Sequence, residues 1–117
     1  MIFHDFHRII RTNMPIATIE AIPGASALTA ALSIAGLDSD TFTFLGFLPH
    51  KKGRETLFKE IVASKRTVVF YESPHRILKT LESLKQHLDV GFPSEGGRRI
   101  LVARELTKIY EENFIGE

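Results

Sequence analysis

Residues 66–71, Arg-Thr-Val-Val-Phe-Tyr, are the strongest strand signal in the chain, because β-branched and aromatic residues follow one another without a break. A short continuous apolar core of this kind is typical of a centre strand that is covered on both faces. Covering both faces of a sheet requires layers of helices. The segment therefore favours an α/β fold over an all-helical or an all-β one.

The rest of the chain alternates between short β-rich runs and helical patterns. The remaining expected elements are strands at about 16–21, 41–45 and 100–103, helices at 3–12, 25–35, 53–64 and from Pro74 onward with Ser73 as N-cap, a loop at 91–97, and an acidic, weakly patterned tail from Tyr110. This order predicts an α/β domain with a mixed sheet flanked by helices. The order of the strands within the sheet stays open.

Size and composition limit the class of protein. The chain has 117 residues, which is enough for one ordinary domain, and its 15 Lys and Arg nearly balance its 14 Asp and Glu. A strongly cationic nucleic-acid domain is therefore excluded, although a local basic patch is not. The chain lacks cysteine, an apolar run of the ~20 residues that cross a bilayer, and a signal peptide. We expect a soluble protein, without a membrane partner, that is compatible with a reducing cytoplasm.

Two segments carry candidate anion-binding groups. Pro23–Ala27 joins an expected strand to a helix of small residues, and the free N–H groups of such a helix start can bind a carboxylate or a phosphate. The alternative is that Ser26 only caps the helix. The turn 49–54 contains Lys51, Lys52 and Arg54, which could contact a phosphate backbone or could simply form a solvated loop.

The other two candidate segments follow strands. Tyr71, Glu72, His75 and Arg76 come at the carboxyl end of the strongest strand, where open α/β sheets bind ligands. His75 could act as a base, but the sequence shows no orienting partner for it, and the whole segment could be an ordinary capped helix start. The segment 104–108 follows the last expected strand with alternating charges. No metal-ligand spacing and no phosphate-binding glycine motif is present, so we expect no metal.

Four segments in series resemble one known family. They are Pro23–Ala27 with Ala30-Ala31 and Gly36-Leu37, then Gly46–Pro49 with Lys51 and Arg54, then Phe70–Arg76, and then Ala103–Lys108 with Tyr110–Glu112. Together they resemble the C-terminal half of the tetrapyrrole (corrin/porphyrin) methylases, and within that superfamily the branch that methylates small-subunit ribosomal RNA. Each motif is weak alone, whereas four in this order are specific.

The resemblance implies an S-adenosylmethionine-dependent methyltransferase that acts on the ribose 2′-oxygen of a cytidine in 16S rRNA, as a homodimer with the cofactor between two α/β domains. By the resemblance, residues 1–14 end a preceding interdomain helix and 15–117 form the C-terminal domain without its final helix and strand. The family's N-terminal domain is also missing. We therefore expect this chain to be inactive alone.

Site residues follow from the same resemblance. The cofactor would contact Ser26, Ala27, Tyr71, Glu72 and Ala103. Lys51, Lys52, Arg54 and Arg76 are our candidates for contacts with RNA.

The expected catalytic pair is Glu72, as the base that activates the poorly nucleophilic 2′-hydroxyl, and Arg104, which would orient it. Two alternatives remain open. One is a methylase of a small tetrapyrrole, and the other is a non-catalytic module for ligand binding or dimerisation.

Overall fold

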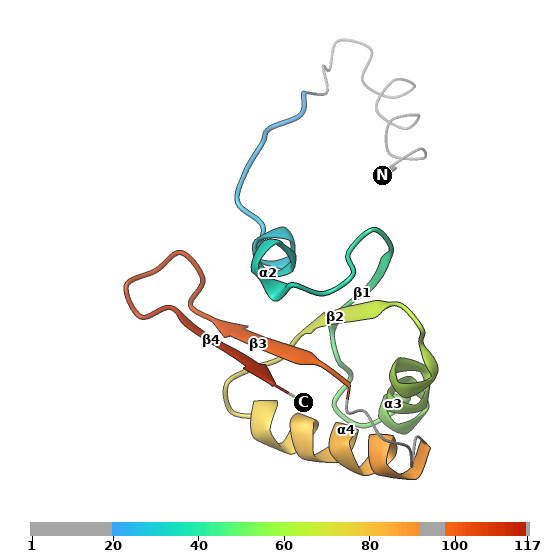
Figure 1. The fold of residues 1–117 in the computed structure, drawn as a ribbon. Helices are drawn as coiled ribbons and strands as arrows, with labels where there is room; N and C mark the ends of the chain where they lie inside the picture. The colour runs from blue at the N-terminus through green and yellow to red at the C-terminus, as the bar shows by residue number, and fades with distance from the viewer. Residues whose placement is uncertain (1–19, 92–97, 117) are drawn as a thin grey trace, which may run out of the picture.

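The computed structural model describes residues 20–91 and 98–116, and these form helices that alternate with strands (Figure 1). In chain order the elements are α2 (Ala27–Ala35), β1 (Phe42–Phe47), α3 (Arg54–Ala63), β2 (Thr67–Tyr71), α4 (Ile77–Gly91), β3 (Ile100–Arg104) and β4 (Glu112–Gly116). The predicted α/β class is confirmed. The expected helix at 3–12, residues 16–19 of the expected strand at 16–21 and residues 92–97 of the expected loop lie outside the described residues, and residues 20 and 21 are not in a strand.

The strands form one parallel and one antiparallel pair. β1 lies parallel to β2, with Phe42 opposite Thr67 and Phe47 opposite Tyr71, and the register shifts between Phe44 and Phe47. Helix α3 makes the crossover that a parallel pair requires. β3 and β4 form an antiparallel hairpin with Ile100 opposite Gly116. In place of the one mixed sheet expected from the sequence, the described residues therefore form two small sheets, one parallel and one antiparallel.

Three sequence predictions differ from the structure. Within the described part of the chain β2 pairs only with β1 and is half-buried throughout, so it is not a covered centre strand. The tail contains β4, which the sequence did not reveal because Phe114 and Ile115 are both exposed and leave no burial pattern. Helix α4 begins at Ile77 rather than at Pro74, because the carbonyl of Ser73 accepts the N–H groups of Arg76 and Ile77 in a preceding turn.

The core lies between the β1–β2 pair and helices α3 and α4. Its buried members are Leu48, Phe58, Ile61 and Leu84, and Leu45, Leu57, Val68 and Phe70 pack against them. The apolar spacing of α3 explains this arrangement, since residues three and four apart share one face of a helix. The core therefore fixes α3 and α4 against the sheet at the two connections that follow β1 and β2.

Helix α2 ends where the sequence predicts and begins at Ala27, two residues later than expected, with Ser26 as its cap. Ser26 has an extended backbone, and its side chain accepts a hydrogen bond from the N–H of Thr29. Gly36 ends the helix in the left-handed conformation, with φ of 59°, which glycine adopts at low cost. These signals place the helix correctly without any tertiary information.

Arg98 joins the start of the hairpin to the end of α3. Its Nη1 donates to the carbonyl oxygens of Ile61 at 2.7 Å and Val62 at 3.3 Å, and its Nη2 donates to that of Arg66 at 3.0 Å. The last carbonyls of a helix have no partner within the helix and carry partial negative charge. A cation with several donors at this position therefore stabilises both α3 and the attachment of β3.

We expect Arg98→Met to lower the free energy of unfolding by about 2 kcal/mol, because the charged hydrogen bonds to the end of α3 are lost. Urea denaturation measures the change. The matched control is Arg99→Met, since exposed Arg99 makes a single long hydrogen bond to the part of the chain that the structure describes, at 3.5 Å to the carbonyl of Gly36. Equal losses in the two variants would contradict the assignment.

His87 bridges α4 and α3 through both ring nitrogens. Nδ1 lies 2.7 Å from the carbonyl oxygen of Ser83, and Nε2 lies 2.9 Å from a carboxylate oxygen of Glu55. A neutral imidazole has a single N–H, so only the protonated ring can donate to both oxygens. The carbonyl of Ser83 and the carboxylate of Glu55 raise the pKa of His87 above 6.5, against burial and the opposing charge of Lys59.

Because this pKa is raised in the folded state, we expect the stabilisation from His87 to be complete below pH 6.5 and to be lost as the pH rises through the folded-state value. Denaturation curves across this range should show the loss in the wild type and not in His87→Gln. His75→Gln, which alters an exposed histidine, should keep the wild-type dependence. A pH dependence that survives in His87→Gln would contradict the prediction.

Candidate functional site

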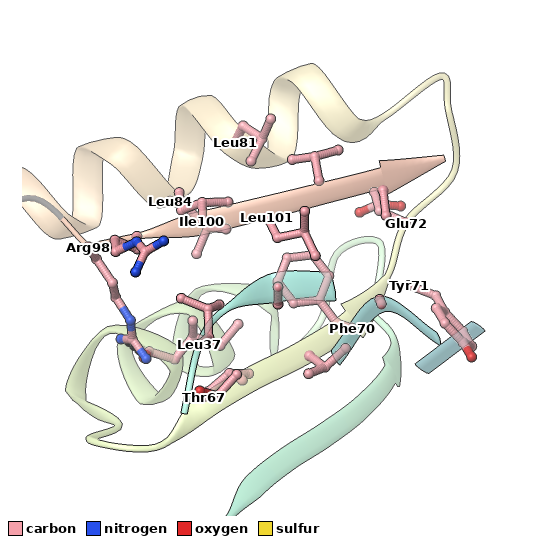
Figure 2. A pocket seen from close by; sticks show the side chains of 18 of the residues that line it. Leu37, Thr67, Phe70, Tyr71, Glu72, Leu81, Leu84, Arg98, Ile100 and Leu101 are labelled. Atoms are coloured by element: carbon pink, nitrogen blue, oxygen red, sulfur yellow. Dashed lines mark hydrogen bonds between the residues drawn. The ribbon is translucent and has the colours of Figure 1, made fainter. Parts of the chain in front are cut away.

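The carboxyl ends of β1, β2 and β3 lie on the same side of the molecule. Parallel pairing places Phe47 at the end of β1 opposite Tyr71 at the end of β2. Figure 2 shows β3 running beside β2 in the same direction, with Glu72 near its arrowhead and Arg98 at the far end. From the sequence we expected the segments after β2 and β3 to lie at carboxyl ends of strands, where α/β sheets bind ligands, but not that the turn after β1 would join them.

A cavity of about 500 Å³ lies between β2 and β3, with walls from α2 and α4 (Figure 2). Its lining is mainly apolar along the strands, and includes Val69, Leu84 and Leu101. Polar groups lie at its two ends, with Arg98 at one end and Tyr71 and Glu72 at the other. A mainly apolar cavity of this size, with charged and polar groups in its lining as well, suits a small-molecule ligand.

Glu72 is the most constrained titratable group of the site, with a side chain only 5% exposed. Its Oε1 accepts the N–H of Ser73 at 2.9 Å, and its Oε2 accepts the hydroxyl of Thr80 at 2.8 Å. Burial alone would raise the pKa of Glu72. The hydrogen bonds from Ser73 and Thr80 and the charges of Arg54 and Arg76 outweigh burial and lower it. The site therefore contains a fixed carboxylate that is ionised at neutral pH.

The guanidinium of Arg54 lies toward Glu72 and away from the two lysines of the same turn. Nη2 donates to Thr80 Oγ1 at 2.7 Å, Nη1 donates to the carbonyl oxygen of Pro49 at 3.0 Å, and Nη1 lies 3.9 Å from Glu72 Oε2. The side chain is 16% exposed, whereas Lys51 and Lys52 are exposed residues. The sequence grouped all three cations as one basic cluster, and the structure separates Arg54 from the others.

Sequence reasoning missed Thr80, which is completely buried. The signal was available, because a threonine interrupts the apolar face that Ile77, Leu81, Leu84 and Leu88 form on α4. A polar residue on such a face needs a hydrogen-bond partner, since an unpaired buried hydroxyl is costly.

Arg104 does not orient Glu72. Its Nη2 lies 2.9 Å from Glu112 Oε2, across the β3–β4 hairpin, and both side chains are more than half exposed. Arg104 and Ala103 do line the carboxyl end of the cavity. The expected orienting role of Arg104 is thus filled by Thr80 and Arg54.

The cofactor residues expected from the resemblance fall into two groups. Tyr71, Glu72 and Ala103 line the cavity, and the Tyr71 ring packs against the rings of Phe44 and Phe47 with centroids 5.2 and 5.5 Å away. Ser26 and Ala27 are exposed and are not part of the lining, and Ser26 acts as the cap of α2.

The remaining polar candidates lie at the surface or near it. Arg76 is half-buried and its charge acts on Glu72, while His75 is exposed. Among residues 20–91 and 98–116, no three acidic or histidine side chains lie close enough to bind a metal ion. In the same residues no helix combines the length and the apolar character needed to cross a bilayer.

Comparison with known proteins identifies the class. The family model of the Tetrapyrrole (Corrin/Porphyrin) Methylases matches residues 1–116, and the chain belongs to this family. This match confirms the family resemblance that the four segments indicated from the sequence alone.

Several curated relatives of this chain share one name, ribosomal RNA small subunit methyltransferase I. The relative from Thermotoga maritima is 38% identical over 99 residues, which cover 85% of this chain and 41% of the relative. The relative from Vibrio cholerae is 44% identical over 107 residues, or 91% of this chain and 35% of its own length. The relative from Halalkalibacterium halodurans is 45% identical over 92 residues, or 78% and 29%. This chain thus spans well under half the length of these relatives.

We expect Glu72→Gln to lower the free energy of unfolding at pH 7 by about 2 kcal/mol, because hydrogen bonds to a buried carboxylate are weakened. The lowered pKa of Glu72 means that its stabilisation is present above pH 4.5 and is lost as the pH falls through the folded-state value. The difference between wild type and variant should therefore shrink in acid. Urea titrations at several pH values measure it, with exposed Glu60→Gln as control. A constant difference at all pH values would contradict the prediction.

Proposed function

We propose that this chain is the C-terminal part of an S-adenosylmethionine-dependent methyltransferase that methylates the 2′-oxygen of a cytidine ribose in 16S rRNA. The family match and the name shared by the relatives support this proposal. The observation that carries it is the cavity between β2 and β3, whose carboxyl-end mouth holds an ionised, fixed carboxylate.

Tyr71, Glu72 and Ala103 would hold the cofactor at this mouth. The carboxylate can accept hydrogen bonds from ribose hydroxyls or an ammonium group, and the aromatic ring offers a flat apolar surface. Bound S-adenosylmethionine would supply a methyl group activated by its sulfonium. Ser26 and Ala27 lie outside the cavity lining, so we propose that they contribute to the cofactor site only together with an N-terminal domain.

Glu72 is also our candidate for activating the nucleophile. A carboxylate within hydrogen-bond reach of the 2′-hydroxyl would accept its proton as the oxygen–methyl bond forms and the methyl–sulfur bond breaks, with the neutral thioether leaving. Such general-base assistance typically contributes 10²–10⁴-fold to rate. Because Thr80 and Ser73 fix both carboxylate oxygens, little reorganisation is needed during the reaction. Arg104 would line the same end of the cavity without touching Glu72.

We propose that Lys51 and Lys52 contact RNA phosphates, because both are exposed on the turn that follows β1. Arg76 is a further proposed contact with RNA. The side chain of Arg54 would hold the turn that carries the two lysines in place, through its hydrogen bonds to Pro49 and Thr80. We further propose a homodimer, for which exposed apolar side chains such as Phe47 and Leu78 are available. A cytoplasmic location follows from the proposed substrate.

The chain alone should be inactive, because half of the cofactor cleft would come from the N-terminal domain. The test is a chimera in which this chain replaces the matching region of the Thermotoga maritima relative. Chimera and chain are given labelled S-adenosylmethionine and small ribosomal subunits that lack the modification, with a corrin precursor in parallel.

We expect the chimera to place label in 16S rRNA as an alkali-resistant 2′-O-methyl dinucleotide, and Glu72→Gln to slow it roughly 10²-fold. Label only in the corrin precursor would overturn the substrate. Label in neither would favour a non-catalytic module, and robust transfer by the 117-residue chain would contradict its inactivity.

A further inference from the structure

The guanidinium of Arg54 contacts the turn that contains the two exposed lysines, Lys51 and Lys52. Arg54 follows the turn directly, its backbone N–H donates to the carbonyl of Lys51 at 3.3 Å, and its side chain reaches back to the carbonyl of Pro49 at 3.0 Å. Gly53 completes the turn with φ of 81°, in the left-handed region. The position of Lys51 and Lys52 is therefore set by where the Arg54 side chain is held.

Thr80 holds that side chain. Arg54 can only donate, so the 2.7 Å contact from its Nη2 must use a lone pair of the threonine oxygen. The single hydroxyl hydrogen is then free to point to Glu72 Oε2, 2.8 Å away. One fully buried hydroxyl thus connects the lysine turn, helix α4 and the carboxylate at the mouth of the cavity.

The other partners of Arg54 do not make this connection. Its guanidinium carbon lies 4.7 Å from the centre of the Phe58 ring, which belongs to the same helix α3. The 3.9 Å separation from Glu72 is longer than a hydrogen bond. The hydroxyl of Thr80 is therefore the direct link between Arg54 and the carboxylate.

We infer that Thr80 is a positioning residue, which sets the lysine turn at a fixed place relative to Glu72 so that RNA held by Lys51 and Lys52 is aligned with the cavity mouth. The inference rests on the proposed function in one respect, namely that RNA is what the lysines bind. The coupling between Thr80 and the turn does not depend on that identity.

The test measures binding of 16S rRNA transcript to the 117-residue chain at several salt concentrations. Each lost contact to a single-strand phosphate lowers the slope of log affinity against log salt by ~0.7. Replacing both lysines by alanine should lower the slope by about 1.4. Thr80→Val should lower the slope by a similar amount. In the variant that already lacks both lysines, Thr80→Val should lower the slope no further. Thr80→Ser, which keeps the hydroxyl, should behave as wild type.

Two further measurements separate positioning from simple loss of stability. Leu45→Ala removes part of the core away from the cavity, so it should lower stability and leave the slope unchanged. Hydrogen exchange of the amides at 50–53 should quicken at least 10-fold in Thr80→Val relative to Leu45→Ala, with no RNA present.

The outcomes distinguish the inference from the proposed function. If the wild-type chain does not bind the transcript, the proposal that RNA is the substrate is overturned. Hydrogen exchange of the amides at 50–53 would still test the coupling between Thr80 and the lysine turn. If Thr80→Val and Leu45→Ala have the same salt slope and the same amide exchange at 50–53, the inference that Thr80 positions the lysine turn is overturned. The proposal that RNA is the substrate then still stands.

Discussion

The ionised carboxylate of Glu72, almost closed off from water, is the constraint on which the arrangement of the site depends. A charge at this depth is stable only where donors surround it. Here two hydrogen-bond donors and one cation come from three separate parts of the chain: the N–H of Ser73 after β2, the hydroxyl of Thr80 on α4, and the charge of the Arg54 guanidinium on α3, 3.9 Å away. Satisfying one carboxylate therefore fixes the relative placement of both helices that cover the parallel strands.

The parallel pairing of β1 and β2 makes this possible. A parallel pair joined by a helix places both carboxyl ends on one side, and the turn after each strand then faces the same region. The lysine turn follows β1 and Glu72 follows β2, so the two meet although about twenty residues separate them in sequence. Because Figure 2 shows β3 ending at the same side, Ala103 and Arg104 reach that region as well.

Local signals in the sequence predicted much of this fold. Ser26 and Gly36 located helix α2, and the β-branched run at 67–71 located β2, because caps and strand propensity act over a few residues. The sequence could not show β4, whose pairing depends on β3 rather than on any apolar pattern of its own. It proposed Glu72 as a site residue and expected Arg104 to orient it, whereas in the structure Arg104 pairs with Glu112. Charge alone marked Arg104, whereas the true partners, Thr80 and Arg54, are set by tertiary packing.

The contacts of Arg98 bear on the order in which the chain assembles. Its acceptors are the carbonyls of Ile61, Val62 and Arg66, up to 37 residues earlier in sequence. These three oxygens converge only after α3 has ended and the chain has turned into β2. The acceptors of Arg98 are therefore in place only when this connection is folded, and local opening of the connection removes this attachment of the hairpin.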